Sequence, residues 1–137
     1  MLWIGIDPGK HTGFAVWNSK TREFVSIETL PIHTAMERVL EYAAESLVTV
    51  VFEDARQRKF FGKNENKVQA KVQGAGSIKR EFGIWEDFLN DKGITFWARK
   101  PEKGMTKKSA EQFRRWTKWE KRTSEHARDA AMLVFGK

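Results

Sequence analysis

The 137-residue sequence predicts a single α/β domain, residues 1–137, with a five-stranded mixed sheet flanked by helices. The first three strands are expected to be antiparallel and the last two parallel. Three strand-like segments follow one another at the amino terminus and are separated by turn residues, which is typical of an antiparallel meander. A later apolar segment follows a helix-like one, which indicates a crossover to a parallel strand.

The opening residues 2–6 are apolar enough for a strand buried on both faces, yet the segment ends in Asp7. Because burying a lone carboxylate is costly, we expect Asp7 at a strand end that faces a cation or a phosphate. An aspartate that only caps the turn at Pro8-Gly9 is the simpler alternative. Residues 12–17 then read as an antiparallel strand.

Residues 23–30 have the pattern of an antiparallel strand with one wet face, and Pro31 ends it. A helix should follow, because Thr34 and Glu37 have the spacing of a capping box. Its apolar positions form one helical stripe that should cover the sheet. They are Met36, Val39, Leu40, Ala43 and Leu47.

Residues 48–52 form a β-branched run that is too apolar for a sheet edge, so we expect a buried strand parallel to the first. This strand ends in Glu53-Asp54. Adjacent parallel strands bring their carboxyl ends together, so Asp7 and Glu53 are expected to be neighbours. Acids that mark the exit of the strand into solvent are the alternative, and a ligand role for Asp54 stays open.

Residues 55–67 mix cations with two phenylalanines, a combination that suits phosphate contacts and base stacking. A tethered hydrophobic plug is the alternative reading of the phenylalanines. A second helical stripe follows over residues 68–82, and a short helix over residues 85–90 should close at Gly93. Residues 94–97 are the predicted fifth strand.

Between Trp97 and Arg122 there are ten Lys and Arg residues against three Glu, an excess equal to the net charge of +7 of the whole chain. Such an excess predicts a polyanionic partner, chiefly nucleic acid, although solvated lysines without a specific role are common. Ser109 and Gln112 have the spacing of a capping box for a helix that carries Phe113 and Trp116 inward.

The candidate contacts to nucleic acid are cations and aromatic residues near the predicted acids. They are Lys10, Arg56, Lys59, Phe60, Phe61, Arg99, Lys103, Lys107 and Lys108.

The last helix should begin at Thr123 or Ser124. His126 and Asp129 are three residues apart and share a face with Ala130, so we expect the side that packs on the sheet to carry a histidine and an acid. An acid and a histidine near a helix start, where the macrodipole favours the acid, are the structural alternative.

The chain contains no cysteine, which excludes disulfides and thiolate metal sites and leaves oxygen ligands and three histidines. Such a donor set favours a hard ion, Mg²⁺, with Mn²⁺ able to substitute. No apolar run is long enough to span a bilayer, and Met1 leads into a strand and not into a signal peptide. We therefore expect a cytoplasmic protein without membrane contact.

Asp7, Glu53, Asp129 and His126 are thus the predicted catalytic and metal-binding residues. Two Mg²⁺ ions among them could activate a water and stabilise the leaving oxygen in phosphodiester hydrolysis. In that scheme Asp7 bridges both ions and Glu53 holds one. Asp129 and His126 hold the other ion or orient the water.

At these positions the sequence resembles the RuvC family of Holliday junction resolvases, which have the ribonuclease H-like fold. The matching segments are Ile4 to Gly9 with Thr12 to Val16, Val51 to Asp54, and His126 to Ala131. The resemblance implies a Mg²⁺-dependent homodimer that nicks opposed strands of a four-way DNA junction, with Lys103 and Lys107 or Lys108 near the scissile phosphate. His126 stands where the family often has an acid, and Asp54 where it commonly has glutamine.

Two other readings are open, and a third does not fit the length of the chain. The same acids would serve a ribonuclease H-like nuclease that acts on other branched DNA or on structured RNA. A junction-binding protein that does not cut is the second reading. The third takes residues 7–13 as the phosphate loop of an actin-like ATPase, but that fold needs a second domain, for which 137 residues leave no room.

Overall fold

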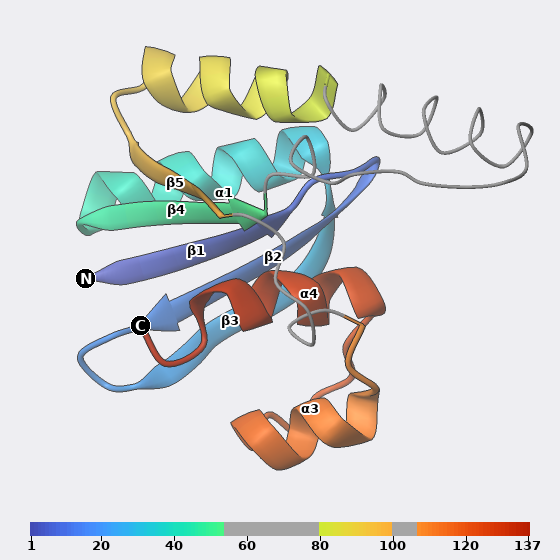
Figure 1. The fold of residues 1–137 in the computed structure, drawn as a ribbon. Helices are drawn as coiled ribbons and strands as arrows, with labels where there is room; N and C mark the ends of the chain where they lie inside the picture. The colour runs from blue at the N-terminus through green and yellow to red at the C-terminus, as the bar shows by residue number, and fades with distance from the viewer. Residues whose placement is uncertain (54–79, 100–106) are drawn as a thin grey trace, which may run out of the picture.

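The computed structural model describes residues 1–53, 80–99 and 107–137. These residues form one five-stranded sheet that is flanked by helices (Figure 1). The elements in chain order are β1 (Leu2–Asp7), β2 (His11–Asn18), β3 (Glu23–Pro31), α1 (Ile32–Glu45), β4 (Val48–Glu53), a helix over residues 80–91, β5 (Thr95–Arg99), α3 (Ala110–Thr117) and α4 (Glu125–Val134). No helix within the described ranges is long and apolar enough to cross a membrane.

The strands lie in the order β3-β2-β1-β4-β5. The first three pair antiparallel, and β4 pairs parallel with both β1 and β5. The expected mixed five-stranded sheet is therefore confirmed, and so is the parallel pairing of the fourth strand with the first. Because β1 lies at the centre of the sheet, its carboxyl end adjoins the carboxyl end of β4.

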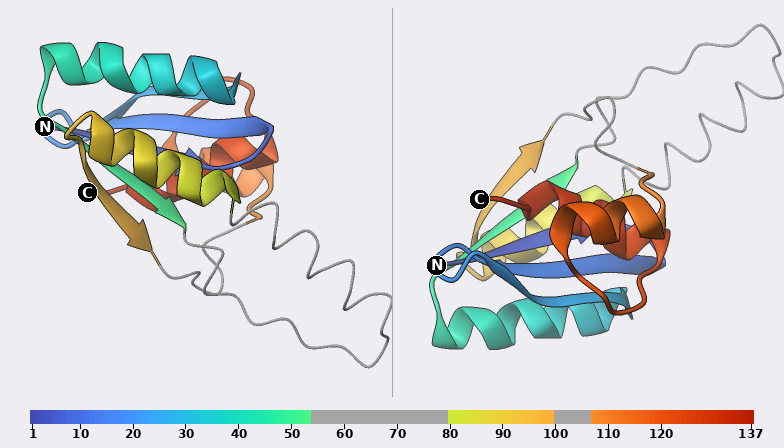
Figure 2. Two further views of the ribbon diagram at one scale, coloured as in Figure 1. Left: turned by 90° about the horizontal axis from the view of Figure 1, so that it is seen from above. Right: turned by 90° about the horizontal axis from the view of Figure 1, so that it is seen from below.

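Alternation along the strands divides the core between the two faces of the sheet. One face packs beneath α1 and the helix over residues 80–91, and its largest fully buried side chains are Phe14, Phe52, Phe82 and Trp85. The other face packs against α4, with smaller residues such as Ala15 and Val51. Figure 2 shows these helices on opposite sides of the sheet, with α3 on the α4 side.

The start of α1 differs from the prediction. The helix begins at Ile32, directly after β3, and its N-cap Pro31 offers no side-chain hydrogen bond. The predicted capping box at Thr34 and Glu37 is therefore wrong. The proline ring fixes φ near the observed −57°, so the chain turns from strand to helix without a polar cap.

The predicted apolar stripe of α1 is partly wrong as well. Ala35 and Val39 are its buried residues, whereas Leu40 is 37% exposed and Leu47, which lies beyond the end of the helix, is 71% exposed. Tyr42 packs partly against the core in place of Leu40, because it stands one helical turn after Val39 on the inner face.

The helix over residues 80–91 ends as predicted. Gly93 has a φ of +65°, and the N–H groups of Gly93 and Ile94 donate to the carbonyls of Asn90 and Leu89 at 3.2 and 2.9 Å. The fifth strand then runs over Thr95–Arg99, slightly later than expected. The predicted loop over residues 55–67 and most of the predicted helix over residues 68–82 lie outside the described residues.

The helix α3 has the predicted capping box, and α4 begins at the predicted position, with Ser124 as its N-cap. The hydroxyl of Ser109 accepts from the N–H of Gln112, whose side chain accepts from the N–H of Ser109, and the hydroxyl of Ser124 accepts from the N–H of Ala127. Phe113 is buried, as expected. Trp116, however, is 56% exposed, so its predicted inward orientation is wrong.

Candidate metal and nucleic-acid site

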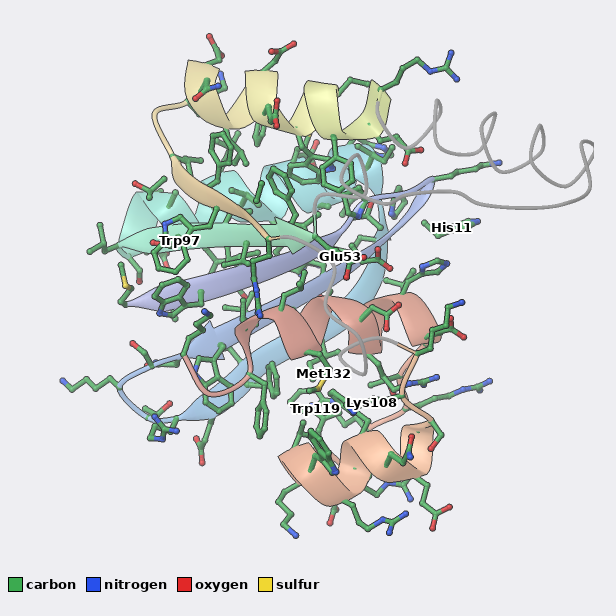
Figure 3. The ribbon with its side chains drawn as sticks, in the orientation of Figure 1. His11, Glu53, Trp97, Lys108, Trp119 and Met132 are labelled. Atoms are coloured by element: carbon green, nitrogen blue, oxygen red, sulfur yellow. The ribbon has the colours of Figure 1, made fainter. Side chains whose placement is uncertain are left out.

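The two strand-end acids lie side by side. Asp7 is the last residue of β1 and Glu53 the last residue of β4, and the preceding residues of the two strands, Ile6 and Phe52, are register partners. Alternation places Asp7 and Glu53 on the face of the sheet that carries α4. Figure 3 shows Glu53 at the end of β4 on this side. This register places Asp7 and Glu53 next to each other at the ends of neighbouring strands, as predicted.

Two glycines bring α4 onto the sheet. A Cβ atom at Gly5 would overlap the carbonyl oxygen of Ala130, and one at Gly13 would overlap the carbonyl oxygen of His126. The backbone of α4 therefore lies directly against β1 and β2, and three of its five buried residues are alanines, namely Ala127, Ala130 and Ala131. This close approach sets the first turn of α4 over the carboxyl end of β1.

As a result, the Nδ1 atom of His126 lies 2.9 Å from the Oδ2 atom of Asp7. The side chain of Asp7 is 27% exposed and that of His126 is 57% exposed. The expectation that His126 belongs to the buried side of the helix is therefore wrong. The backbone of the first turn of α4 lies directly against Gly13, so the imidazole of His126 lies at the edge of the interface, where it contacts Asp7.

The environment of Asp7 disfavours its charged form. Burial is the largest cause and raises the pKa of Asp7 to about 6 from an ordinary value of 3.8. The hydrogen bond with His126 opposes this increase, while the charges of Asp129 and Glu53 add to it. The three carboxylates are therefore within electrostatic reach of one another.

Asp129 is half-buried and has a hydrogen bond of its own. The backbone N–H of Lys107 donates to its Oδ1 atom at 2.8 Å. Burial raises the pKa of Asp129, the Lys107 hydrogen bond opposes the increase, and the charges of Glu125 and Glu53 add to it. The segment before α3 is thus attached to the acid that the last helix contributes.

The donor chemistry of this cluster fits a hard divalent cation. Three carboxylates and one imidazole converge, and a cation would offset the burial that raises the pKa of Asp7. In the described part of the chain, no three His, Asp or Glu side chains lie so that they could hold a metal ion together.

Four of the predicted nucleic-acid contacts lie in the described residues. Lys10 is exposed in the turn between β1 and β2. Arg99 ends β5 and donates to the carbonyl of Leu133 at 3.2 Å, while Lys107 and Lys108 precede α3. The remaining predicted residues lie outside the described ranges. They are Arg56, Lys59, Phe60, Phe61 and Lys103, and Asp54, whose ligand role stayed open, lies outside as well.

Three features of the site were not predicted from the sequence. These are the roles of Gly5 and Gly13 in the approach of α4 and the hydrogen bond from Lys107 to Asp129. An isolated glycine within a strand is a recognised sign that another backbone approaches, so the glycines could have been found. The Lys107 contact joins residues far apart in the sequence and leaves no local pattern.

The comparisons with known proteins find no protein-family model and no curated protein that matches the chain.

Proposed function

We propose that the protein is a Mg²⁺-dependent endodeoxyribonuclease that resolves four-way DNA junctions by paired nicks. The observation that carries the proposal is the convergence of Asp7, Glu53 and Asp129 from three separate elements, with His126 hydrogen-bonded to Asp7. A fold gains little from gathering like charges at a partly buried site, so the cluster is best explained by a cationic ligand.

The residues would divide the work of phosphodiester hydrolysis among them. Asp7, Glu53 and Asp129 would hold Mg²⁺, which when bound polarises the scissile phosphate and lowers the pKa of a bound water. His126 is exposed enough to reach solvent, and it would position the attacking water or accept its proton. Lys107, fixed to Asp129 through its backbone, would direct its side chain to the phosphate backbone.

The choice of a four-way junction rests on the resemblance to the RuvC family. The sheet, with three antiparallel strands and two further parallel ones, supports the ribonuclease H-like fold that the resemblance implies. Paired nicks need two active sites in one complex, so a homodimer is part of the proposal. The excess of basic residues supports DNA as the partner.

The test is a cleavage assay with end-labelled substrates of matched sequence, namely a four-way junction, a flap, a duplex and a structured RNA. We expect the wild-type protein with Mg²⁺ to nick the junction in opposed strands. Asp7→Asn should lower the cleavage rate at least about 100-fold while leaving junction affinity in chelator nearly unchanged. Asp91→Asn is the matched control, because its carboxylate is 73% exposed and pairs only at the surface with Lys92.

Each alternative gives a different result. Preferential cleavage of the flap or the RNA would assign the same chemistry to another substrate. Junction binding without nicks in either Mg²⁺ or Mn²⁺ would identify a non-catalytic junction-binding protein. Cleavage by Asp7→Asn at the wild-type rate would reject the site.

A further inference from the structure

The two helical layers carry opposite charge. On one side of the sheet, α1 and the helix over residues 80–91 contain seven acidic residues against two arginines. On the other side, residues 107–122, which include α3, contain seven Lys and Arg residues against two Glu. A polyanion would therefore approach the α3 side of the molecule, which is also the side of the acidic cluster.

The helix α3 is attached by little of its own surface. Phe113 is its only buried residue, and it packs into the cluster beneath α4. Figure 1 shows α3 beyond α4, on the side away from the sheet. With respect to the described residues, the other side chains of α3 are exposed apart from the half-buried Thr117, and they include two consecutive arginines, Arg114 and Arg115.

Trp116 stands among these cations with an exposed ring. It is 56% exposed, and among the described residues it is the only large hydrophobic side chain exposed on α3 or α4. The Nζ atom of Lys108 lies 3.9 Å from the centre of the ring. One isolated ring within a basic surface is not the wide apolar patch that a protein partner would need.

The segment before α3 links the Trp116 contact to the acidic cluster. The carbonyl of Lys108 accepts from the Nε atom of Arg128 at 2.8 Å, and the adjacent N–H of Lys107 donates to Asp129 at 2.8 Å. These two hydrogen bonds connect the segment before α3 to Arg128 and Asp129 of α4. The lysine that contacts the Trp116 ring is therefore adjacent in sequence to the residue that is hydrogen-bonded to Asp129.

We propose that Trp116 is a stacking platform for an unpaired nucleobase of the bound strand, with Lys108 and the arginines of α3 receiving its phosphates. Every nucleobase has a flat π-face, so such stacking suits a splayed or single-stranded nucleotide and offers nothing to a paired one. The proposal rests on the proposed function for its nucleic-acid ligand. It adds that the substrate has an unpaired nucleotide beside the cleavage site.

The test measures binding in chelator, where no cleavage occurs. Fluorescence anisotropy compares a single-stranded oligonucleotide with the matching duplex, for the wild-type protein, Trp116→Ala and Trp116→Phe. We expect Trp116→Ala to weaken single-strand binding about tenfold and duplex binding less than about twofold, with most of the loss restored by Trp116→Phe. Trp97→Ala is the matched control, since this tryptophan is 47% exposed and also lies near a lysine, Lys137.

A second measurement detects stacking directly. A 2-aminopurine base in the single strand should lose fluorescence on binding the wild-type protein or Trp116→Phe, and keep it with Trp116→Ala. The proposal is overturned if Trp116→Ala binds like Trp97→Ala, if both DNA forms lose affinity equally, or if phenylalanine does not restore binding. Failure of the nuclease proposal would appear in the Mg²⁺ cleavage assay and would leave these binding results unchanged.

Discussion

The two faces of the sheet differ in how they are packed and in what they carry. Beneath α1 and the helix over residues 80–91 the face is filled by large side chains such as Phe14 and Trp85, and the helices present acidic surfaces. On the other face, Gly5 and Gly13 lie directly beneath the backbone of α4, and the titratable residues gather at the end of this contact. Both faces contain bulky core residues, but only the second holds a helix backbone close enough to the strands to assemble the candidate site.

The largest expected effect comes from separating α4 from the sheet. In Gly5→Ala the new methyl group overlaps the carbonyl of Ala130, so the helix or the strand must move. We expect the free energy of unfolding to fall by about 3 kcal/mol, as for overpacked cores. Chemical denaturation measures this loss, and the Asp7–His126 contact should be lost with it, which NMR of the His126 ring would detect.

The matched control is on the other face. Gly83 lies in the helix over residues 80–91, and a Cβ atom there would meet nothing within 4 Å. Gly83→Ala should therefore stabilise the protein by about 0.5–1 kcal/mol, because alanine favours the helix. Equal effects of the two substitutions would mean that the close approach of α4 is not what distinguishes the faces.

The next largest effect comes from the free-energy cost of keeping the carboxylate of Asp7 charged in the folded protein. Because the pKa of Asp7 is raised to about 6 in the folded protein and is about 3.8 when unfolded, the folded state binds this proton more tightly. Stability should therefore fall as pH rises from about 4 to about 6, and the full cost remains above pH 6. Two pKa units correspond to about 3 kcal/mol.

Asp7→Asn removes this cost. Without metal, the variant should be more stable than the wild-type protein at pH 7.5 by up to about 3 kcal/mol, and the difference should vanish below about pH 4. Thermal unfolding in chelator at a series of pH values measures this difference in stability. The control, Asp91→Asn, should show no pH-dependent difference from the wild type. Added Mg²⁺ should narrow the gap by stabilising only the wild-type protein. A variant less stable than the wild type at pH 7.5 would contradict the assignment.

The sequence predicted those elements whose signals are local. The apolar runs of β1 and β4, the capping box at Ser109 and the cap at Ser124 each depend on a few neighbouring residues. The convergence of Asp7 and Glu53 followed from parallel pairing alone, because adjacent parallel strands must end together.

The errors concern features that depend on tertiary packing. Phe113 and Trp116 are three residues apart on one helix, but only the Phe113 ring is buried, where it contacts Phe24 of β3 and packs with residues of α4. Helical periodicity predicts which residues share a face of a helix. It does not predict how much of that face the rest of the protein covers. Likewise, His126 lies at the edge of the interface between α4 and the sheet. The reason is the short distance between helix and sheet, which Gly5 and Gly13 permit.

The smallest expected effect tests the difference in charge between the two helical layers. Arg115 is 70% exposed on α3 and has a 3.9 Å surface pair with Glu111, which contributes little to stability. If it contacts a phosphate, Arg115→Gln should lower the salt dependence of DNA binding, d log K/d log[salt], by about one unit. Arg80→Gln, on the acidic layer, removes the same charge and should leave this slope unchanged. Equal slopes for the two variants would show that overall charge, and not the α3 surface, attracts the DNA.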